Sequence, residues 1–407
     1  MGKKRMLALL GALFLTITMA FNPLSGMGAE KYVSYLALID FTGPTGSFTS
    51  MYAEGVADYI KYWNDQGGAD GVKLKPIFID ARYDASRAVS AYQKYRKEPK
   101  LMFVYSHITS AARVLYPLTF RDKIALQTGG AGYFQHLCGW AFTHSPTYQD
   151  GFSATLDWMV EDWKKKGNPG KPVVGYIAWD NPYGREHLLG GREYAEKIGV
   201  KLLPPEFFPQ GSLKHDVWLT RLENQGANYI FVAVVDPEAS NTVRDAYALG
   251  MTKKIQFVSD IHGTTMETGV TLHPEELEGL VIVSNGVRGS DDAHNHQFSM
   301  LWKKYGKSKP TMQYGYMTGV GYGIVYTKAL KLAVRDAGYE KIDGEAYFKA
   351  LLKLTGEDTM DIMGKVDLSP TSRRITNEVK FYRVKGGKMV PISGWVKCPD
   401  AVSLHKW

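Results

Sequence analysis

Short apolar runs alternate with amphipathic segments from residue 31 onward. The runs have the length and composition of buried strands, whereas the intervening segments repeat apolar residues every three or four positions, as helices do. The predicted strands are 31–41, 72–80, 101–105 and 124–128, and the predicted helices are 51–66, 85–97 and one that begins near 109. Strands separated by such helices form parallel βαβ units.

The same alternation begins again after the segment 142–146. The predicted helices are 148–166, 185–198, 215–225 and 237–249, and the predicted strands are 173–179, 200–208, 229–235 and 255–258. The chain has 407 residues, which is too long for one ordinary domain. The repeated pattern therefore predicts an α/β protein with two lobes, each built on a parallel central sheet.

The C-terminal third does not continue this series. It predicts a strand at 280–284, helices at 296–305, 317–336 and 344–354, and a hairpin over 377–395 with Gly386-Gly387 as its turn. Because this portion is too small for a third domain, its elements must join the two lobes. The predicted division is a signal peptide at 1–29, lobe 1 at 30–147 and 284–362, and lobe 2 at 148–283 and 363–407.

The N-terminus has the pattern of a secretory signal. Lys3, Lys4 and Arg5 precede an apolar run over 6–20, and no acidic residue occurs before Glu30. An uncleaved membrane anchor is the alternative, although the run is short for a bilayer span. Signal cleavage and a periplasmic location are therefore expected.

The net charge does not indicate nucleic-acid binding. The chain has 49 basic and 41 acidic residues, which gives a formal charge of +8, but part of that excess lies in the signal and the rest is scattered. The two cysteines, Cys138 and Cys398, are compatible with one disulfide in an oxidising compartment, and two buried free thiols are the alternative.

Candidate binding residues follow the ends of the predicted strands, where ligands bind to open parallel sheets. The first half offers a Gly-Pro turn with Phe48 after it, the segment from Tyr105 to Thr109, and the segment from Gln127 to Gly130. A helix that starts at Ser106 or Thr109 could bind a carboxylate with its exposed N–H groups, or these hydroxyls could simply cap it. The second half offers Tyr183, Asp236 and Asp260, where either acid could meet a ligand ammonium or cap a helix.

Motifs of the common enzyme classes are missing. The chain has no GxSxG elbow, no GxxxxGK[ST] loop and no HExxH. The glycines of 319–323 follow no strand and indicate close helix packing rather than a nucleotide loop. His294 and His296 lie in a polar loop whose composition favours an exposed turn over a metal site. We therefore expect no catalytic residue, no metal and no cofactor.

In their order and spacing, several of these features resemble the type I periplasmic binding proteins of ABC importers, in particular their leucine/isoleucine/valine-binding branch. The features are Gly43-Pro44, 106–112, 142–146, Asp180 followed by Tyr183-Gly184, and 244–250. The resemblance covers about 31–395. It implies two Rossmann-like lobes with parallel central sheets, joined by a three-segment hinge that closes on a solute.

The resemblance also implies roles for particular residues. The carboxylate-binding segment of the family matches Ser106 to Thr109, and its cleft aromatics match Phe48 and Tyr183. The match is incomplete elsewhere, because Gly132 stands where the family often has a hydroxyl and Ile261 stands where an acid usually meets the ammonium. Asp260, His262 or Asp236 could substitute for that acid.

The predicted ligand-binding set combines these positions: Phe48, Tyr105, Ser106, His107, Thr109, Gln127, Thr128, Gly129, Gly130, Tyr183, Asp236 and Asp260. The expected function is an extracytoplasmic receptor, not an enzyme. It would be a monomer that captures an amino acid or a similar small carboxylate or amide and delivers it to an ABC permease. The alternatives are a ligand-binding sensor for a membrane receptor, an extracytoplasmic hydrolase with His107 or His262 as base, and a structural surface protein.

Overall fold

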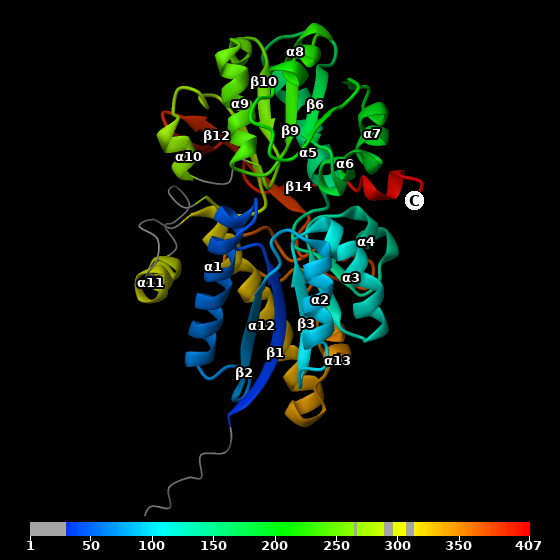
Figure 1. Ribbon diagram of the computed structural model, residues 1–407, viewed down its shortest axis with the longest axis vertical. Coiled ribbons are helices and arrows are strands. Elements are labelled where there is room, and N and C mark those ends of the chain that lie inside the picture. The colour runs from blue at the N-terminus through cyan, green and yellow to red at the C-terminus, as the bar shows by residue number, and fades with distance from the viewer. Residues whose placement is uncertain (1–29, 264–266, 289–295, 307–312) are drawn as a thin grey trace, which may run out of the picture. The chain divides into compact units, whose positions relative to one another are not determined.

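The computed structural model describes residues 30–263, 267–288, 296–306 and 313–407. The predicted signal peptide and His294 lie outside this part, as does the side chain of His296. The helices and strands build two separate sheets (Figure 1). Within the described part, no helix combines the length and the apolar character that crossing a membrane requires.

The first sheet contains five parallel strands in the order β2-β1-β3-β4-β5. These strands are β1 (Lys31–Ile39), β2 (Val72–Asp80), β3 (Leu101–Ser106), β4 (Ala125–Thr128) and β5 (Ala141–Thr143). The helices between them are α1 (Gly46–Asp65), α2 (Ala85–Tyr95), α3 (Thr109–Arg121) and α4 (Gly132–Leu137). The predicted βαβ series of the first half is confirmed, and α4 and β5 are additions that the pattern did not predict.

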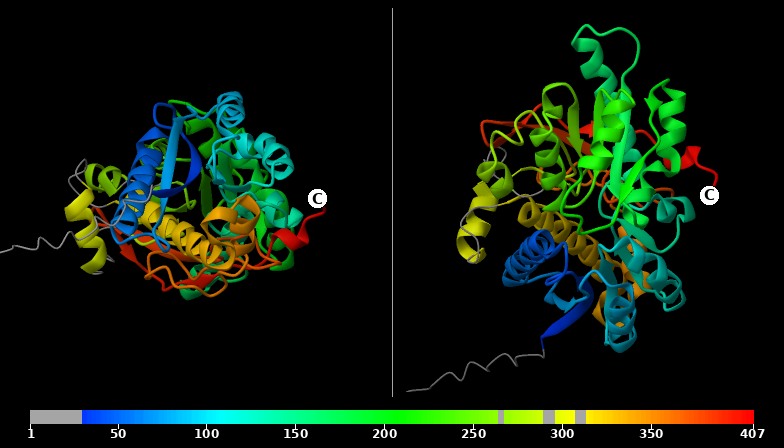
Figure 2. Two further views of the ribbon diagram at one scale, coloured as in Figure 1. Left: turned by 90° about the horizontal axis from the view of Figure 1, so that it is seen from below. Right: turned by 45° about the horizontal axis from the view of Figure 1, so that its top comes forward.

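The long helix α12 (Tyr314–Lys341) packs against α1, although nearly 250 residues separate them in sequence (Figure 2). Glycines make this contact close. A side chain at Gly319 would place its Cβ 2.2 Å from the carbonyl oxygen of Tyr52, and one at Gly55 would collide with the backbone of Tyr316. The close helix packing predicted for 319–323 is thereby confirmed. The helix α13 (Gly344–Leu351) contacts β3 and β4 of the same sheet.

The second sheet has the order β13-β12-β11-β10-β9-β6-β7, with β8 beside β6 and β14 beside β12. Its parallel strands are β6 (Val173–Trp179), β7 (Lys201–Leu202), β8 (Glu206–Phe208), β9 (Tyr229–Ala233), β10 (Gln256–Ser259) and β11 (Val281–Ser284). Its antiparallel strands are β12 (Glu378–Lys385), β13 (Lys388–Pro391) and β14 (Val396–Lys397). The predicted hairpin, with its turn at Gly386-Gly387, is therefore confirmed.

The other described helices follow the order of the chain. They are α5 (Tyr148–Lys165), α6 (Pro182–Glu186), α7 (Leu188–Lys197), α8 (Asp216–Asn224), α9 (Glu238–Ala248), α10 (Glu267–Leu272) and α11 (His296–Tyr305), with the 3-10 turns η1 (Met251–Lys253) and η2 (Val402–Leu404).

Two predicted elements of the second half are each divided in the structure. The strand predicted at 200–208 is two short strands, β7 and β8, because Pro204 and Pro205 cannot donate to a ladder. The helix predicted at 185–198 is α6 followed by α7, and Gly190 has a φ of +106° near the start of α7. Side chains rarely adopt that φ, so glycine permits the kink.

Three segments connect the first sheet to the second. The first is the stretch between β5 and α5, and the second follows β11 toward α12. In the third, Thr143 at the end of β5 exchanges backbone hydrogen bonds with Arg373 and Ile375, just before the chain enters β12. Three connections agree in number with the expected hinge, while the exact lobe boundaries remain a prediction.

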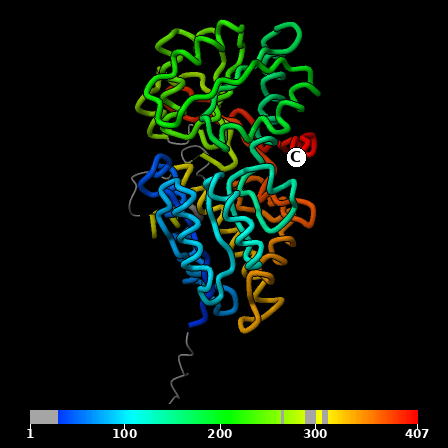
Figure 3. Tube along the Cα trace, turned by 45° about the vertical axis from the view of Figure 1, so that its right-hand side comes forward, coloured from blue at the N-terminus to red at the C-terminus, as the bar shows by residue number. Residues whose placement is uncertain are grey.

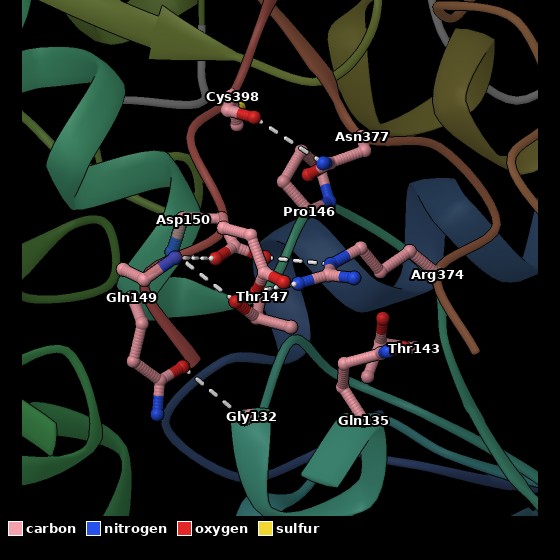
Figure 4. A network of polar contacts seen from close by, with 12 residues as sticks. Gly132, Gln135, Thr143, Pro146, Thr147, Gln149, Asp150, Arg374, Asn377 and Cys398 are labelled. Atoms are coloured by element: carbon pink, nitrogen blue, oxygen red, sulfur yellow. Dashed lines mark hydrogen bonds and ion pairs between the residues drawn. The ribbon is translucent and has the colours of Figure 1, made fainter. Parts of the chain in front are cut away.

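A cluster of charges lies where the first and third connections meet (Figure 4). The guanidinium of Arg374 donates to Asp150, with 2.6 Å between Nε and Oδ2, and to Asp400, with 2.8 Å between Nη2 and Oδ1. The other carboxylate oxygen of Asp150 accepts from the backbone N–H of Ala401. We call Asp150, Arg374 and Asp400 the crossover cluster.

The cysteines correct the favoured sequence interpretation, because Cys138 and Cys398 are both free thiols. Cys138 ends α4, and its Sγ is 3.4 Å from the carbonyl oxygen of Pro370. Cys398 is buried, and burial raises the pKa of its thiol well above the usual value. The third connection is held to α4 by Arg373, which donates to the carbonyls of Cys138 and Gly139.

Candidate functional site

One cavity collects side chains from both sheets, and the centre of a water-sized sphere can occupy about 40 Å³ of it. Its aromatic lining residues are Phe48, Tyr52, Tyr83, Tyr105, Tyr148, Tyr183, Tyr314 and Tyr322. The others are His107, His144, His262, Thr45, Thr49, Thr109, Thr318, Gly129 and Val235. We call this the aromatic cavity.

The cavity lies at the carboxyl ends of the parallel strands. Tyr105 is near the end of β3, and Gly129 follows β4. From the second sheet come Val235, which follows β9, and His262, which follows β10. This is the location that parallel sheets favour for ligands, because loops and helix starts converge there.

Several of the lining rings pack against each other. His144 stacks on Tyr105 and Tyr322, with ring centroids 4.5 and 4.2 Å apart. Phe48 and Tyr314 are nearly parallel, with 5.9 Å between their centroids. Tyr148 from α5 and Tyr183 from α6 meet edge to face at 5.2 Å. In each pair, one ring supports the position of the other, so the cavity wall is largely formed before a solute binds.

A chain of hydrogen bonds determines the tautomer of His107. The Gly-Pro turn brings Thr45 to Asp40, where the Thr45 hydroxyl donates to the carboxylate at 2.7 Å. That hydroxyl has one proton, so its 3.3 Å contact with Nε2 of His107 must have the histidine as donor. The Nδ1 atom of His107 is then an acceptor, and it has no hydrogen-bond partner among the described residues.

The three histidines of the cavity are neutral near pH 7. Burial, together with a smaller contribution from the nearby His262, lowers the pKa of His107 to about 3. Burial also lowers the pKa of His144 well below its usual value, and that of His262, where Asp260 partly opposes the effect. The imidazoles therefore add polarity to the cavity without adding charge.

One acidic residue beside the cavity, Asp260, is engaged by protein groups. Asp260 is buried, accepts a hydrogen bond from the Tyr183 hydroxyl and lies 3.2 Å from Nε2 of His187. Although burial alone would raise its pKa, His187, His262 and Tyr183 together lower the pKa of Asp260 to about 2. Asp260 is thus a carboxylate held behind the ring of Tyr183.

The described lining of the cavity contains no Asp, Glu, Lys or Arg. Its polar groups are hydroxyls, imidazoles and backbone amides. The first turn of α3, which starts at Thr109, carries the positive end of a helix dipole, and its N-cap Ile108 has no side-chain hydrogen bond to those amides. The site can therefore donate hydrogen bonds to an anion but offers no negative charge to a cation.

Six of the twelve residues predicted from the sequence line the cavity: Phe48, Tyr105, His107, Thr109, Gly129 and Tyr183. The structure brings them together from four separate segments. Their contact with a ligand remains a prediction, because no solute is present.

The other six predicted residues do not line the cavity. Ser106, Gln127 and Thr128 are buried in β3 and β4, and their side chains have no hydrogen-bond partner among the described residues. Gly130 packs beside Pro146 of the first connection. Asp236 accepts from the hydroxyl of Ser240, as a helix-capping residue does, and Asp260 lies behind Tyr183.

Sequence reasoning did not predict most of the tyrosines in the wall. Tyr314, Thr318 and Tyr322 lie on one face of α12 at a spacing of four, which was a readable signal for a common surface. Tyr148 begins α5 directly after the first connection, the place where a side chain can reach both sheets. Tyr83 and His144 follow strands that carried no glycine-rich turn to mark them.

A family model for periplasmic binding proteins matches residues 37–388. A curated relative, an amino acid binding protein of Pseudomonas aeruginosa, is 24% identical over 254 residues, which are 59% of this chain and 64% of that protein. The chain thus spans less than two thirds of the length of this relative.

Solved structures share the fold. A branched-chain amino acid ABC transporter protein of Thermus thermophilus with bound valine has a TM-score of 0.79 at 18% identity, covering 92% of this chain and 98% of that one. A solute-binding protein of Rhodopseudomonas palustris HaA2 in complex with p-hydroxybenzoic acid has a TM-score of 0.74 at 17% identity, covering 91% and 98%. With the family match over most of its length, the chain belongs to the periplasmic binding protein family.

Proposed function

We propose that this protein is the extracytoplasmic solute receptor of an ABC importer, which captures a small solute in the aromatic cavity and delivers it to a membrane permease. The observation that carries the proposal is the lining of one cavity by strand-end residues of both sheets. A solute that touches both sets of residues stabilises the arrangement in which they are close, and this is how ligand binding drives closure. The predicted lobes and the periplasmic location are part of the proposal.

The first turn of α3 is the proposed binding site for the anionic end of the solute. Thr109 and Gly129 border the cavity there, and the backbone N–H groups of a helix start favour a carboxylate. The rings of Phe48 and Tyr183 would form opposite apolar walls. Within this proposal, Ser106 acts behind the site rather than on the solute, since it is buried and does not line the cavity.

The test is a titration of the protein without residues 1–29 against small carboxylates, amides and amino acids, followed by calorimetry and small-angle scattering. A receptor binds one solute per chain, returns it chemically unchanged and becomes more compact. Turnover of the solute would instead indicate a hydrolase, and saturation without compaction would contradict closure. Loss of uptake in cells that lack the gene would connect the receptor to a permease rather than to a sensor.

A further inference from the structure

The charge of the cavity wall restricts the solutes that the proposed receptor can accept. An α-amino acid carries an ammonium group, and burying that charge without an opposite charge is costly even when neutral oxygens accept its hydrogen bonds. No acidic side chain lines the described cavity, and Asp260 is held by Tyr183 and His187. The wall thus lacks the group that an amino acid needs.

The opposite end of the same solute meets a different environment. The helix start at Thr109 presents backbone donors and a positive dipole end. Among the tyrosine hydroxyls of the wall, those of Tyr183 and Tyr314 already donate to Asp260 and Asn285, and the others can donate to a solute. A carboxylate is therefore compatible with the cavity, whereas an ammonium is not.

The shape of the wall favours a ring between these groups. Eight Phe and Tyr rings line the cavity, and they come from α1, α5, α6 and α12 as well as from strand ends. Aromatic pairs gain free energy beyond their buried area when stacked or edge to face, so a planar ring can pack on several of them. An aliphatic chain of the same size gains only the burial.

A quaternary ammonium ion is the competing occupant, because aromatic walls also attract cations. Such an ion needs free ring faces. Phe48 and Tyr314 each use a face on the other, and Tyr105 and Tyr322 each use one on His144. The edges of these stacked rings carry a positive partial charge, so they can contact the face of a planar solute ring but repel a cation.

We propose that the solute is an aromatic carboxylate without a free amino group. This inference rests on the proposed function, since it names the solute class of the same site. The chemistry that recognises it is the combination of a helix start for the carboxylate, rings from both sheets for the aromatic group, and an uncharged wall that rejects ammonium.

Pairs of compounds isolate each part of this proposal. 3-Phenylpropanoate and phenylalanine differ only in the α-amino group, and we expect the amine-free acid to bind at least about 100-fold more tightly in calorimetry. Benzoate and cyclohexanecarboxylate differ in the aromatic ring, and we expect about tenfold in favour of benzoate. Phenyltrimethylammonium and glycine betaine test the competing occupant and are expected not to bind measurably.

Two variants on one helix connect the binding to the cavity. Phe48→Ala removes a lining ring of α1 and is expected to weaken the best aromatic acid about 10- to 100-fold. Tyr62→Ala removes an exposed ring of the same helix and is expected to change the affinity less than about twofold. A thermal unfolding curve without solute for each variant separates a loss of affinity from a loss of folding.

The outcomes distinguish the solute class from the receptor function. If phenylalanine or leucine binds as tightly as the amine-free acids, or a quaternary ammonium binds more tightly, the proposal is overturned while the receptor function stands. If no compound of this panel or of the wider screen of amides and amino acids binds or stabilises the fold, both are overturned. If the amine-free aromatic acids bind best and Phe48→Ala weakens them selectively, the proposal is supported.

Discussion

The crossover cluster and the aromatic cavity differ in the charge of their polar groups and in how completely those groups are paired. In the crossover cluster, Arg374 is 5% exposed and Asp150 is fully buried, and each charge has an opposite charge as partner (Figure 4). In the aromatic cavity, the polar groups are neutral, and Nδ1 of His107 has no partner among the described residues. Buried charges that are paired within the protein stabilise the fold, whereas neutral polar groups without a partner can still bind a ligand.

The C-terminal segment extends the crossover cluster. Its turn η2 contacts both α4 and α7 (Figure 3). Trp407 stacks on His136 of α4, with 5.3 Å between ring centroids. His405 contacts Glu193 of α7, with 2.7 Å between Nδ1 and Oε1. The last ten residues therefore connect helices that accompany the two different sheets, so the charged cluster has a structural role.

Removal of the buried cation should have the largest effect. We expect Arg374→Met to lower the free energy of unfolding by about 3 kcal/mol, because Asp150 would lose its counter-charge in a buried position. Urea unfolding monitored by circular dichroism measures this. The control is Arg335→Met, whose exposed guanidinium pairs with Asp336 and should contribute much less to stability, because solvent screens an exposed pair.

A double variant sharpens the result. Asp150→Leu combined with Arg374→Met removes both charges and should recover part of the loss. Equal losses for Arg374→Met and Arg335→Met would show that the crossover cluster is no more important than a surface pair.

Acidification should lower the stability of the fold through the neutral histidine His107 of the aromatic cavity. The folded-state pKa of His107, about 3, lies below its ordinary value of 6.5, so between these limits the unfolded chain binds the proton more readily. Stability contributed by the neutral His107 is therefore complete above pH 6.5 and decreases as the pH falls toward 3. From pH 6.5 to 4.5 the wild type should lose about 2 kcal/mol more than His107→Gln.

The measurement is a series of urea unfolding curves over that pH range. His273→Gln, at a half-exposed imidazole of the second half of the chain, is the control and should follow the wild type. Parallel pH profiles for the wild type and His107→Gln would contradict the assignment of His107 as a neutral group of the folded protein.

Tyr183 lies at the border between the two kinds of environment, since its ring lines the cavity and its hydroxyl donates to Asp260. Tyr183→Phe keeps the ring and removes the donor. We expect a loss of about 1 to 2 kcal/mol of stability and a change in solute affinity below about threefold. A much larger loss of affinity with unchanged stability would instead place the hydroxyl, or Asp260, in direct contact with the solute.

The sequence predicted the architecture better than the wall of the cavity. Apolar periodicity reports on burial against a sheet, so the strands, most helices and the tail hairpin were readable. It does not report on which sheet-end residues converge, because that depends on the three connections and on the contact of α1 with α12. Tyr148 and Tyr322 were therefore not predicted, and Ser106 and Thr128 were included although only their neighbours Tyr105, His107 and Gly129 line the cavity.

The acidic candidates lie outside the cavity lining for a related reason. Asp236 and Asp260 both follow strands in sequence, yet one caps a helix through Ser240 and the other is held by Tyr183 and His187. A strand-end acid is equally able to serve a ligand or its own chain. Which role it has depends on the residues that the fold places beside it, and a local sequence pattern does not contain that information.

The smallest effect concerns the thiols beside the crossover cluster. Cys138 and Cys398 are free, so a reducing agent should change the free energy of unfolding by less than about 0.5 kcal/mol, whereas loss of a native disulfide typically costs 2 to 5 kcal/mol. Unfolding curves with and without dithiothreitol, together with thiol counting in denaturant, measure this.

Cys138→Ser is the sharper variant, because its half-exposed position tolerates a hydroxyl in place of the thiol that now meets the carbonyl of Pro370. A large destabilisation by the reducing agent would mean that a covalent bond, rather than the charges of Asp150 and Arg374, holds the C-terminal segment in place.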